Sequence, residues 1–326
     1  MSSSNQKINT TSHVNVYQGS NLPRILSKPV VTVGTFDGIH KGHQALFNRM
    51  NDVAFRTGGE TLVITFNTHP RVVLNHRHDI RMLNTFEEKI ELIEKAGVEN
   101  VWVLPFTRSL AETSAAGFVE DYLVGRAGVS HFVVGYDHTF GKGGKAQFGD
   151  LQKLAQKLGF TIEKIEAVLI DGKTVASTNV RDALIMGNIP AANKMLGYHY
   201  SLRGRIVRGN QIGKLIGYPT ANLALTDPYK LIPATGVYAC IIDWKGNSYK
   251  SMGNIGYRPT IHANQLTIEA NIFDFDHDIY NHHVTIRFIE RIRDERKFGS
   301  LQQLKMQLAY DKEMVLKIFG GGSISA

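Results

Sequence analysis

The sequence predicts an α/β plus β protein: a parallel sheet with helices on both faces in the N-terminal part, and a small β-barrel in the C-terminal part. The chain has 326 residues, which is long enough for two hydrophobic cores. Apolar strands alternate with helix-periodic segments up to about residue 185, and short β-rich segments follow. A composition with 43% hydrophobic and 20% charged residues excludes disordered and fibrous proteins.

The N-terminal strands are expected at short β-branched or apolar runs, residues 30–33, 62–66, 101–104 and 132–134. Helices between them are indicated by apolar residues three or four positions apart, with Ser114 as one cap and Gly97 as one end. The apolar positions are Leu46, Met50, Val53, Ala54, Phe86, Ile90, Ile93, Phe118, Tyr122, Leu151, Leu154 and Leu158. This alternation predicts a doubly covered parallel sheet, which binds ligands at the carboxyl ends of its strands.

The C-terminal part is predicted to be a barrel that ends in a helix. Its β-rich segments are residues 201–207, 236–242, 266–273 and 284–288, separated by turn-forming residues. Ser300 can cap the final helix, whose apolar face would hold Leu301, Leu304, Leu308 and Val315. We therefore expect domains at 14–186 and 187–319, with flexible ends at 1–13 and 320–326.

Composition also restricts the compartment and the partners. The formal net charge of +8 suits anionic ligands, from nucleoside triphosphates to nucleic acid, without choosing among them. The polar start and the lack of an apolar run of about 20 residues favour a cytoplasmic protein. The single cysteine, Cys240, cannot form an intramolecular disulfide and is expected to be a buried small hydrophobe.

The segment VVTVGTFDGIHKGH places a strand directly before a glycine turn and the start of a helix. Backbone N–H groups in such a turn can approach a phosphate, and the helix N-terminus adds partial positive charge. His40 and His43 lie three residues apart in the first helical turn and could donate to triphosphate oxygens. The alternative is a glycine turn with two surface histidines. The candidate turn residues are Gly34, Thr35, Phe36, Asp37 and Gly38.

This string resembles the signature of the nucleotidyltransferase superfamily, and a second segment, ASTNVR, resembles that family's ISSTxxR motif. The resemblance implies that Ser177, Thr178 and Arg181 hold ATP phosphates, and it implies a Rossmann-like sheet. Ala176 replaces the first serine of the motif. Taken alone, Ser177 and Thr178 favour a simple helix cap over a phosphate site.

Two more segments narrow the resemblance to the bacterial bifunctional riboflavin kinase/FAD synthetase family. TFNTHPRVVL is similar to its TFxPHPR segment, and GYDHTFGKG is similar to its GxDFxFG loop, with Thr68 and His138 as departures. The resemblance implies that the flavin side of the adenylyl-transfer pocket is lined by His69, Pro70, Arg71 and Asp137. Without it, these residues indicate a turn after a strand and a loop acid.

A second candidate site lies where the barrel is predicted. Glycines recur at Gly209, Gly213 and Gly217, and the chain has no GxxxxGK[ST] loop. Thr220 and Asn222 carry oxygens on one side of an extended segment, which suits Mg²⁺ with phosphates as further ligands, and Lys214 could act as a countercharge. Spacing alone favours a hairpin with a proline turn over a binding site.

The run GNQIGKLIGYPTANL is similar to the riboflavin kinase PTAN signature, which includes Pro219. The resemblance implies that Glu269, in the strand TIEANIFDF, is the general base for the ribityl 5′ hydroxyl. It also implies that Arg293 and Glu295 lie near the flavin, although a surface ion pair is the alternative.

The resemblance implies an enzyme that phosphorylates riboflavin with ATP and then transfers an adenylyl group from a second ATP to FMN, giving FAD and pyrophosphate. We expect Mg²⁺ as cofactor, small-molecule substrates, neither nucleic acid nor membrane as partner, and a monomer or weak oligomer. Two alternatives stay open: a nucleotidyltransferase for another phosphorylated substrate, and a non-catalytic flavin- or RNA-binding protein.

Overall fold

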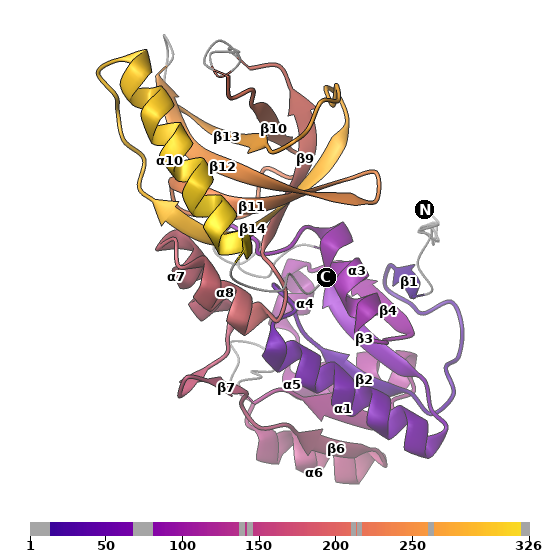
Figure 1. The fold of residues 1–326 in the computed structure, drawn as a ribbon. Coiled ribbons are helices and arrows are strands. Elements are labelled where there is room, and N and C mark those ends of the chain that lie inside the picture. Colours follow the sequence, from indigo (N-terminus) through magenta and orange to yellow (C-terminus); the bar gives the residue numbers. More distant parts are fainter. Residues whose placement is uncertain are drawn as a thin grey trace. The chain divides into compact units, whose positions relative to one another are not determined.

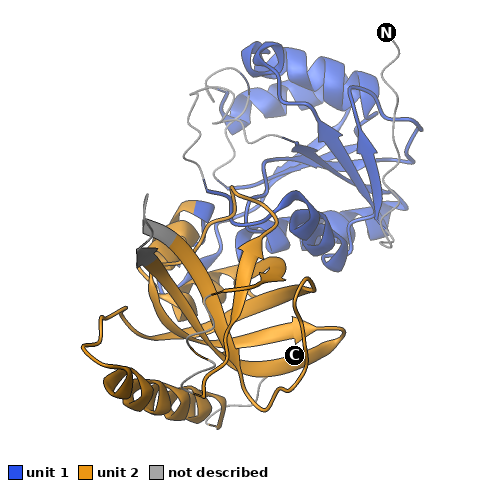
Figure 2. Ribbon diagram, turned by 90° about the horizontal axis from the view of Figure 1, so that it is seen from above, with its two compact units in different colours: residues 1–177 blue, residues 178–326 orange. Residues whose placement is uncertain are grey.

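The computed structural model describes residues 14–67, 81–136, 141, 146–209, 213, 217–259 and 264–320. The chain forms two compact units, residues 1–177 and 178–326, which Figure 2 shows in blue and orange. Unit 1 contains the parallel sheet and unit 2 the closed barrel, so both predicted architectures are confirmed. The domain ranges 14–186 and 187–319 stay predictions.

The unit 1 sheet has six strands, all parallel, in the order β1-β4-β3-β2-β5-β6. The four predicted strands are present, and β1 and β6 are additional. These two have the mostly polar sequences NVYQ and TIEK, which show no apolar run, and they occupy the two edges. The strands are β1 (Asn15–Gln18), β2 (Val30–Val33), β3 (Thr61–Phe66), β4 (Asn100–Leu104), β5 (His131–Val134) and β6 (Thr161–Lys164).

Helices cover both faces of this sheet (Figure 1). Because successive strand residues point to opposite faces, Val63 packs in one core with α1 and α3, and its neighbour Ile64 packs in the other with η1 and α6. The helices are α1 (Lys41–Thr57), α3 (Phe86–Lys95), α4 (Arg108–Glu112), α5 (Ala115–Phe118), the π-helical η1 (Val119–Arg126) and α6 (Phe148–Leu158). A two-stranded ribbon follows, β7 (Leu169–Ile170) with β8 (Lys173–Thr174).

The predicted helix after Ser114 is present but changes its hydrogen-bond pattern. The Ser114 side chain accepts from Gly117 N, which caps α5 as expected. From Val119 onward the segment is π-helical, and at its end Ala127 N bonds to Tyr122 O five residues earlier at 3.0 Å. Sequence periodicity did not indicate this change.

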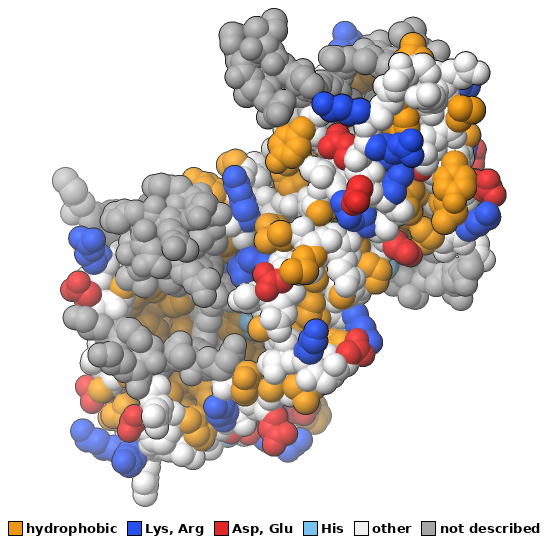
Figure 3. Space-filling model, turned by 90° about the vertical axis from the view of Figure 1, so that its left-hand side faces the viewer, with side chains coloured by type: hydrophobic (Ala, Val, Ile, Leu, Met, Phe, Trp, Pro, Cys, Tyr) orange, Lys and Arg blue, Asp and Glu red, His pale blue; other side chains and the backbone are white. Residues whose placement is uncertain are grey.

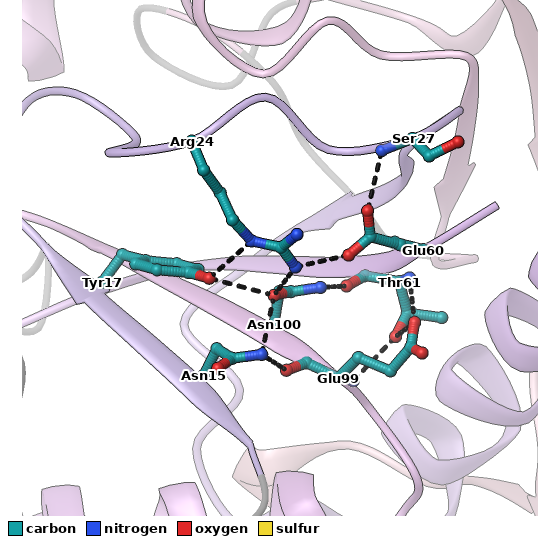
Figure 4. Close-up of polar contacts among 8 residues, drawn as sticks. All are labelled: Asn15, Tyr17, Arg24, Ser27, Glu60, Thr61, Glu99 and Asn100. Carbon is teal, nitrogen blue, oxygen red and sulfur yellow. Dashed lines mark hydrogen bonds and ion pairs between the residues drawn. The ribbon is translucent and has the colours of Figure 1, made fainter. Parts of the chain in front are cut away.

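A polar network fixes the amino ends of the strands in unit 1 (Figure 4). Asn100 is fully buried at the start of β4, and its side-chain nitrogen donates to Thr61 O, at the start of β3, at 3.0 Å. Its oxygen accepts from Arg24 at 3.2 Å and from Tyr17 at 3.4 Å, and Arg24 also pairs with Glu60. Ligands of parallel sheets bind at the opposite, carboxyl ends, so this network is structural.

Unit 2 is a closed antiparallel barrel in the order β10-β13-β12-β11-β14-β9. β10 and β12 were not predicted as strands. In β11 seven consecutive residues are buried, because Tyr238, Cys240 and Ile242 alternate with Val237, Ala239 and Ile241, which pack under α10. The strands are β9 (Ser201–Val207), β10 (Ala221–Leu225), β11 (Gly236–Trp244), β12 (Asn247–Pro259), β13 (Asn264–Ile272) and β14 (His283–Arg293).

The helices in the described part of unit 2 are α7 (Ser177–Ile185), which begins at the last residue of unit 1, α8 (Ile189–Leu196) and α10 (Leu301–Gly320). Ser300 Oγ accepts from Gln303 N at 3.2 Å, as the predicted cap requires. Val315 is buried, but Leu301 is 59% exposed, so its placement in the apolar face was wrong. The contact face of α10 is formed from its C-terminal half, by Val315 and Phe319.

The surface charge is mixed. Lys and Arg side chains are interspersed with Asp and Glu side chains on the face drawn in Figure 3. Cys240 is buried and free, as expected. Among the helices that the structure describes, none is both long enough and apolar enough to span a bilayer.

Candidate active sites

The loop between β2 and α1 in unit 1 has an unusual backbone. Gly34 N donates to Ile64 O at 3.0 Å and so extends the hydrogen bonding between β2 and β3 by one residue. Beyond it, Phe36, Gly38 and Ile39 have φ values of 48°, 91° and 37°, in the left-handed region. Two of the three are not glycine, which costs about 1–2 kcal/mol each. Contacts from elsewhere in the unit must therefore hold this loop.

Asp37 supplies one such contact. Its carboxylate is 1% exposed, and Oδ1 accepts from Leu83 N at 2.9 Å and from Asn84 N at 3.2 Å. Its backbone oxygen accepts from Ser177 Oγ at 2.8 Å. The predicted phosphate residues Asp37 and Ser177 thus meet, and the Asp37 side chain anchors the loop. Phe36 is also buried, so these loop residues can approach a ligand only through the backbone.

His40 and His43 lie together at the start of α1. Their rings stack with centroids 3.7 Å apart and planes at 17°, and Nδ1 of His40 accepts from His43 N at 3.4 Å as the helix cap. Burial, then the charges of His40 and Lys89, hold the pKa of His43 well below its usual value. Nδ1 of His43 is buried and has no hydrogen-bond partner among the described residues.

The sequence analysis missed Lys89 of α3. This lysine is 5% exposed, and its Nζ donates to Thr35 O at 2.8 Å. Burial lowers its pKa to about 8 despite the attraction of Asp37. The signal was available, because Lys89 falls at helical spacing between the apolar residues Phe86 and Ile93, on the face expected to be buried.

Other predicted residues of the adenylyl-transfer site cannot be placed beside this loop. Thr178 and Arg181 fall in unit 2; Arg181 lies one helical turn after Ser177 on α7. His69, Pro70, Arg71 and Asp137 lie outside the described residues. The roles of these six residues stay predictions.

In unit 2, two neighbouring strands bring the predicted kinase residues together. In the antiparallel pairing of β10 with β13, Asn222 is directly opposite Glu269. Thr220, two residues before Asn222, donates from Oγ1 to Glu269 Oε2 at 3.2 Å. Asn222 is 9% exposed. A carboxylate, a hydroxyl and an amide thus form one cluster whose oxygen atoms could ligate a cation.

Glycines make room for this cluster. A Cβ on Gly209 would come within 2.3 Å of the Asn222 amide, so a larger residue there would displace that side chain. Gly213 O accepts from Tyr218 N at 2.8 Å, which closes the loop before the PTAN segment, and Gly217 has a φ of 85°. Lys214 lies outside the described residues.

Asn271 is a second residue that the sequence analysis missed. It is 6% exposed, and its Nδ2 donates to Pro219 O at 2.7 Å, which fixes the backbone just before Thr220. Its position two residues after Glu269, on the same face of β13, was the available signal.

Arg293 forms an ion pair, and its partner is not Glu295. Its guanidinium contacts the buried carboxylate of Asp311 on α10, with 2.7 Å between Nη2 and Oδ2. Glu295 Oε2 accepts instead from Tyr257 N at 3.4 Å. A contact of Arg293 with flavin stays a prediction.

The comparisons with known proteins agree with this arrangement. The family described as FAD synthetase matches residues 22–179, and the family described as riboflavin kinase matches residues 196–319. The bifunctional riboflavin kinase/FMN adenylyltransferase of Listeria monocytogenes is 38% identical over 87% of this chain and 90% of its own length. The Bacillus subtilis enzyme of that name is 36% identical over 90% and 93%.

A solved structure from Streptococcus pneumoniae, described as a macrolide-efflux protein, is similar over the whole fold. It has a TM-score of 0.85 and 34% identity and covers 92% of this chain and 98% of its own.

A phosphate-type loop on a parallel sheet and an oxygen cluster on a closed barrel define a two-unit transferase of the nucleotidyltransferase-plus-kinase class. More narrowly, the chain belongs to the bifunctional riboflavin kinase/FMN adenylyltransferase family.

Proposed function

We propose that the chain converts riboflavin into FAD in two ATP-dependent steps: phosphorylation to FMN in unit 2, and adenylyl transfer to FMN in unit 1. The family matches to residues 196–319 and 22–179 support this division. The observation that carries the proposal is the cluster of Thr220, Asn222 and Glu269 on β10 and β13. Phosphorylation of riboflavin would thus have its own polar site in unit 2, separate in sequence from the glycine loop of unit 1.

In the first step, Glu269 accepts the proton of the ribityl 5′ hydroxyl as that oxygen attacks the γ-phosphorus of ATP, and ADP leaves. The Thr220 hydroxyl donates to Oε2 and so orients the carboxylate. Phosphoryl transfer depends mainly on positioning and electrostatics, which fits a site built on two hydrogen-bonded strands.

The residues present fit Mg²⁺, a hard cation that prefers oxygen ligands. Thr220 and Asn222 supply such oxygens, and the position of Asn222 depends on the missing side chain at Gly209. When bound, Mg²⁺ would neutralise charge on the nucleotide phosphates. Thr220 and Asn222 would hold it, while Glu269 serves as the base.

In the second step, a phosphate oxygen of FMN attacks the α-phosphorus of ATP, and pyrophosphate leaves. FMN phosphate is already an anion, so the protein needs to supply neither a nucleophile nor a strong base. His40, His43 and backbone N–H groups of the loop after Gly34 stabilise the charge that develops on the phosphates. We retain flavin contacts for His69, Pro70, Arg71, Asp137 and Arg293, and phosphate contacts for Thr178 and Arg181.

We further propose a cytoplasmic enzyme that acts on small molecules alone, as a monomer or weak oligomer. The free, buried thiol of Cys240 is consistent with a reducing compartment. Size-exclusion chromatography with light scattering tests the oligomeric state. RNA binding that falls steeply with salt would contradict the proposed partners.

The experiment is incubation of the chain with riboflavin, ATP and Mg²⁺, with FMN and FAD separated by chromatography. We expect FMN first and FAD second, and FAD also when FMN replaces riboflavin. A chain that consumes neither flavin would overturn the proposal. FAD from FMN but no FMN from riboflavin would remove only the kinase step.

A further inference from the structure

The segment from Leu83 to Lys89 bonds the unit 1 loop at two points, once to a side-chain carboxylate and once to a backbone carbonyl. Backbone N–H groups of Leu83 and Asn84 donate to the Asp37 carboxylate, and Lys89 Nζ donates to Thr35 O at 2.8 Å. The two loop residues flank Phe36, which has a left-handed backbone. The lysine therefore bonds the loop next to a residue whose backbone conformation is unfavourable.

The start of α3 is fixed by its own capping interactions. Thr85 and Glu88 form a reciprocal capping box, with Glu88 N donating to Thr85 Oγ1 at 3.2 Å and Thr85 N donating to Glu88 Oε2 at 3.0 Å. Both residues are buried. Lys89 follows directly, so its side chain starts from a fixed backbone.

Lys89 also determines where the positive charge of this site lies. Among the described residues, the ionisable groups that act on it or share its surroundings are Asp37 on the loop, His40 and His43 on α1, and Glu88 on α3 itself. Two imidazolium rings stacked at 3.7 Å would repel each other, and a lysine ammonium nearby would add a third positive charge. The site favours a charged Lys89 and an uncharged His43.

We propose that Lys89 is a positioning residue for adenylyl transfer: its ammonium group holds the Thr35 carbonyl and adds to the effect of burial in favouring an uncharged His43, which meets the triphosphate as a neutral donor. The inference rests on the proposed function of unit 1. The positive charge that favours the nucleotide then comes from Lys89, and it is lost progressively as the pH rises through about 8. A neutral imidazole acting as a donor has precedent in other enzymes.

Three substitutions separate the hydrogen bond from the charge. Lys89→Arg keeps both, Lys89→Gln keeps a donor without charge, and Lys89→Met removes both. Lys95→Gln is the matched control, because Lys95 is an exposed lysine at the end of the same helix. Riboflavin phosphorylation in unit 2 serves as an internal control and should not change in any variant.

The first measurement is the NMR titration of the His43 imidazole in the unliganded protein, assigned with His43→Asn. The Gln and Met variants should raise the His43 pKa, because one cause of its depression is removed; Lys89→Arg and Lys95→Gln should leave it unchanged. An unchanged midpoint in Lys89→Gln overturns the electrostatic role. This readout needs no catalysis, so it stands even if the proposed function fails.

The second measurement is kcat/KM for ATP in FAD formation from FMN, which reports groups of the free enzyme. Lys89→Met should lower it about tenfold or more, as expected for a lost charged hydrogen bond to a partly buried carbonyl. The wild-type value should fall as the pH rises through about 8, and Lys89→Arg should abolish that fall. A wild-type-like fall in Lys89→Arg, or a full rate in folded Lys89→Met, overturns the proposal.

Discussion

The two sites are built in opposite ways. In unit 1, residues with candidate chemistry lie close in sequence, within the loop and first turn from Gly34 to His43, and the residues that support them come from distant segments at Leu83–Lys89 and Ser177. In unit 2, Asn222 and Glu269 are distant in sequence, and the regular pairing of β10 with β13 brings them together. A strand pair fixes its residues by register, whereas an irregular loop needs individual anchors.

This difference predicts how each site fails. The unit 2 site should lose activity when a reacting group is removed and otherwise tolerate change, because the barrel ladder holds it. The unit 1 site should also lose stability when its supporting residues are changed. Four substitutions test this comparison.

The largest effect is expected from Glu269→Gln. The amide keeps an oxygen for the Thr220 hydroxyl to bond but cannot take the ribityl proton. Riboflavin phosphorylation should fall by about 10²–10⁴-fold, and FAD formation from FMN should not change. Chromatography with each flavin as the starting substrate measures both. A normal phosphorylation rate would exclude Glu269 as the base.

His43→Ala should be nearly as severe for the other reaction. Loss of a preorganised donor to the phosphates should slow FAD formation from FMN by about 10²–10³-fold, while riboflavin phosphorylation continues. Single-turnover assays with saturating ATP would isolate the chemical step. An unaffected rate would remove His43 from the mechanism, and an equal loss in both reactions would contradict the separation of the sites.

Asp37→Ala tests the loop anchor. Two buried backbone N–H groups would lose their acceptor, which should lower the free energy of unfolding of unit 1 by about 2–3 kcal/mol. The two tryptophans lie in different units, so urea unfolding followed by Trp102 fluorescence in a Trp244→Phe background reports on unit 1. Asp52→Ala, an exposed site on α1, is the control. Equal midpoints for the two variants would contradict the anchoring role.

Gly209→Ala should give the smallest effect. The new methyl group would push the Asn222 amide out of place, and the KM for ATP in riboflavin phosphorylation should rise about tenfold. Gly320→Ala, where a Cβ would meet nothing within 4 Å, is the control. A kinase with unchanged KM would show that the position of Asn222 is not critical.

The fold was largely predictable, because its main strands are apolar and its helices have regular periodicity. β1 and β6 were not predicted, because these edge strands carry mostly polar residues. β12 was not predicted, because its sequence, NSYKSMGNIGYRP, lacks a sustained alternation of apolar and polar residues. The π-helical turn of η1 left no signal, since its sequence is also compatible with an α-helix.

The site residues were predictable to different extents. Local strings such as GTFDGIH carry their own signal, whereas Glu269 could be singled out only through resemblance, since one acidic residue in an alternating strand has no distinguishing pattern. Lys89 and Asn271 had a signal in their spacing, but their partners could not be predicted, because they bond backbone oxygens, Thr35 O and Pro219 O, and such partners leave no trace in residue type.

The strand order has one more consequence, for self-association. The barrel closes on itself, so its ladder offers no template for an added strand, but the six-stranded sheet ends at β1 and β6. Each of these has only four residues, and β6 carries Glu163, which is bonded by Arg49, and Lys164. Short edge strands, and the charges on β6, discourage intermolecular β-pairing, so aggregation through the sheet should require prior unfolding of unit 1.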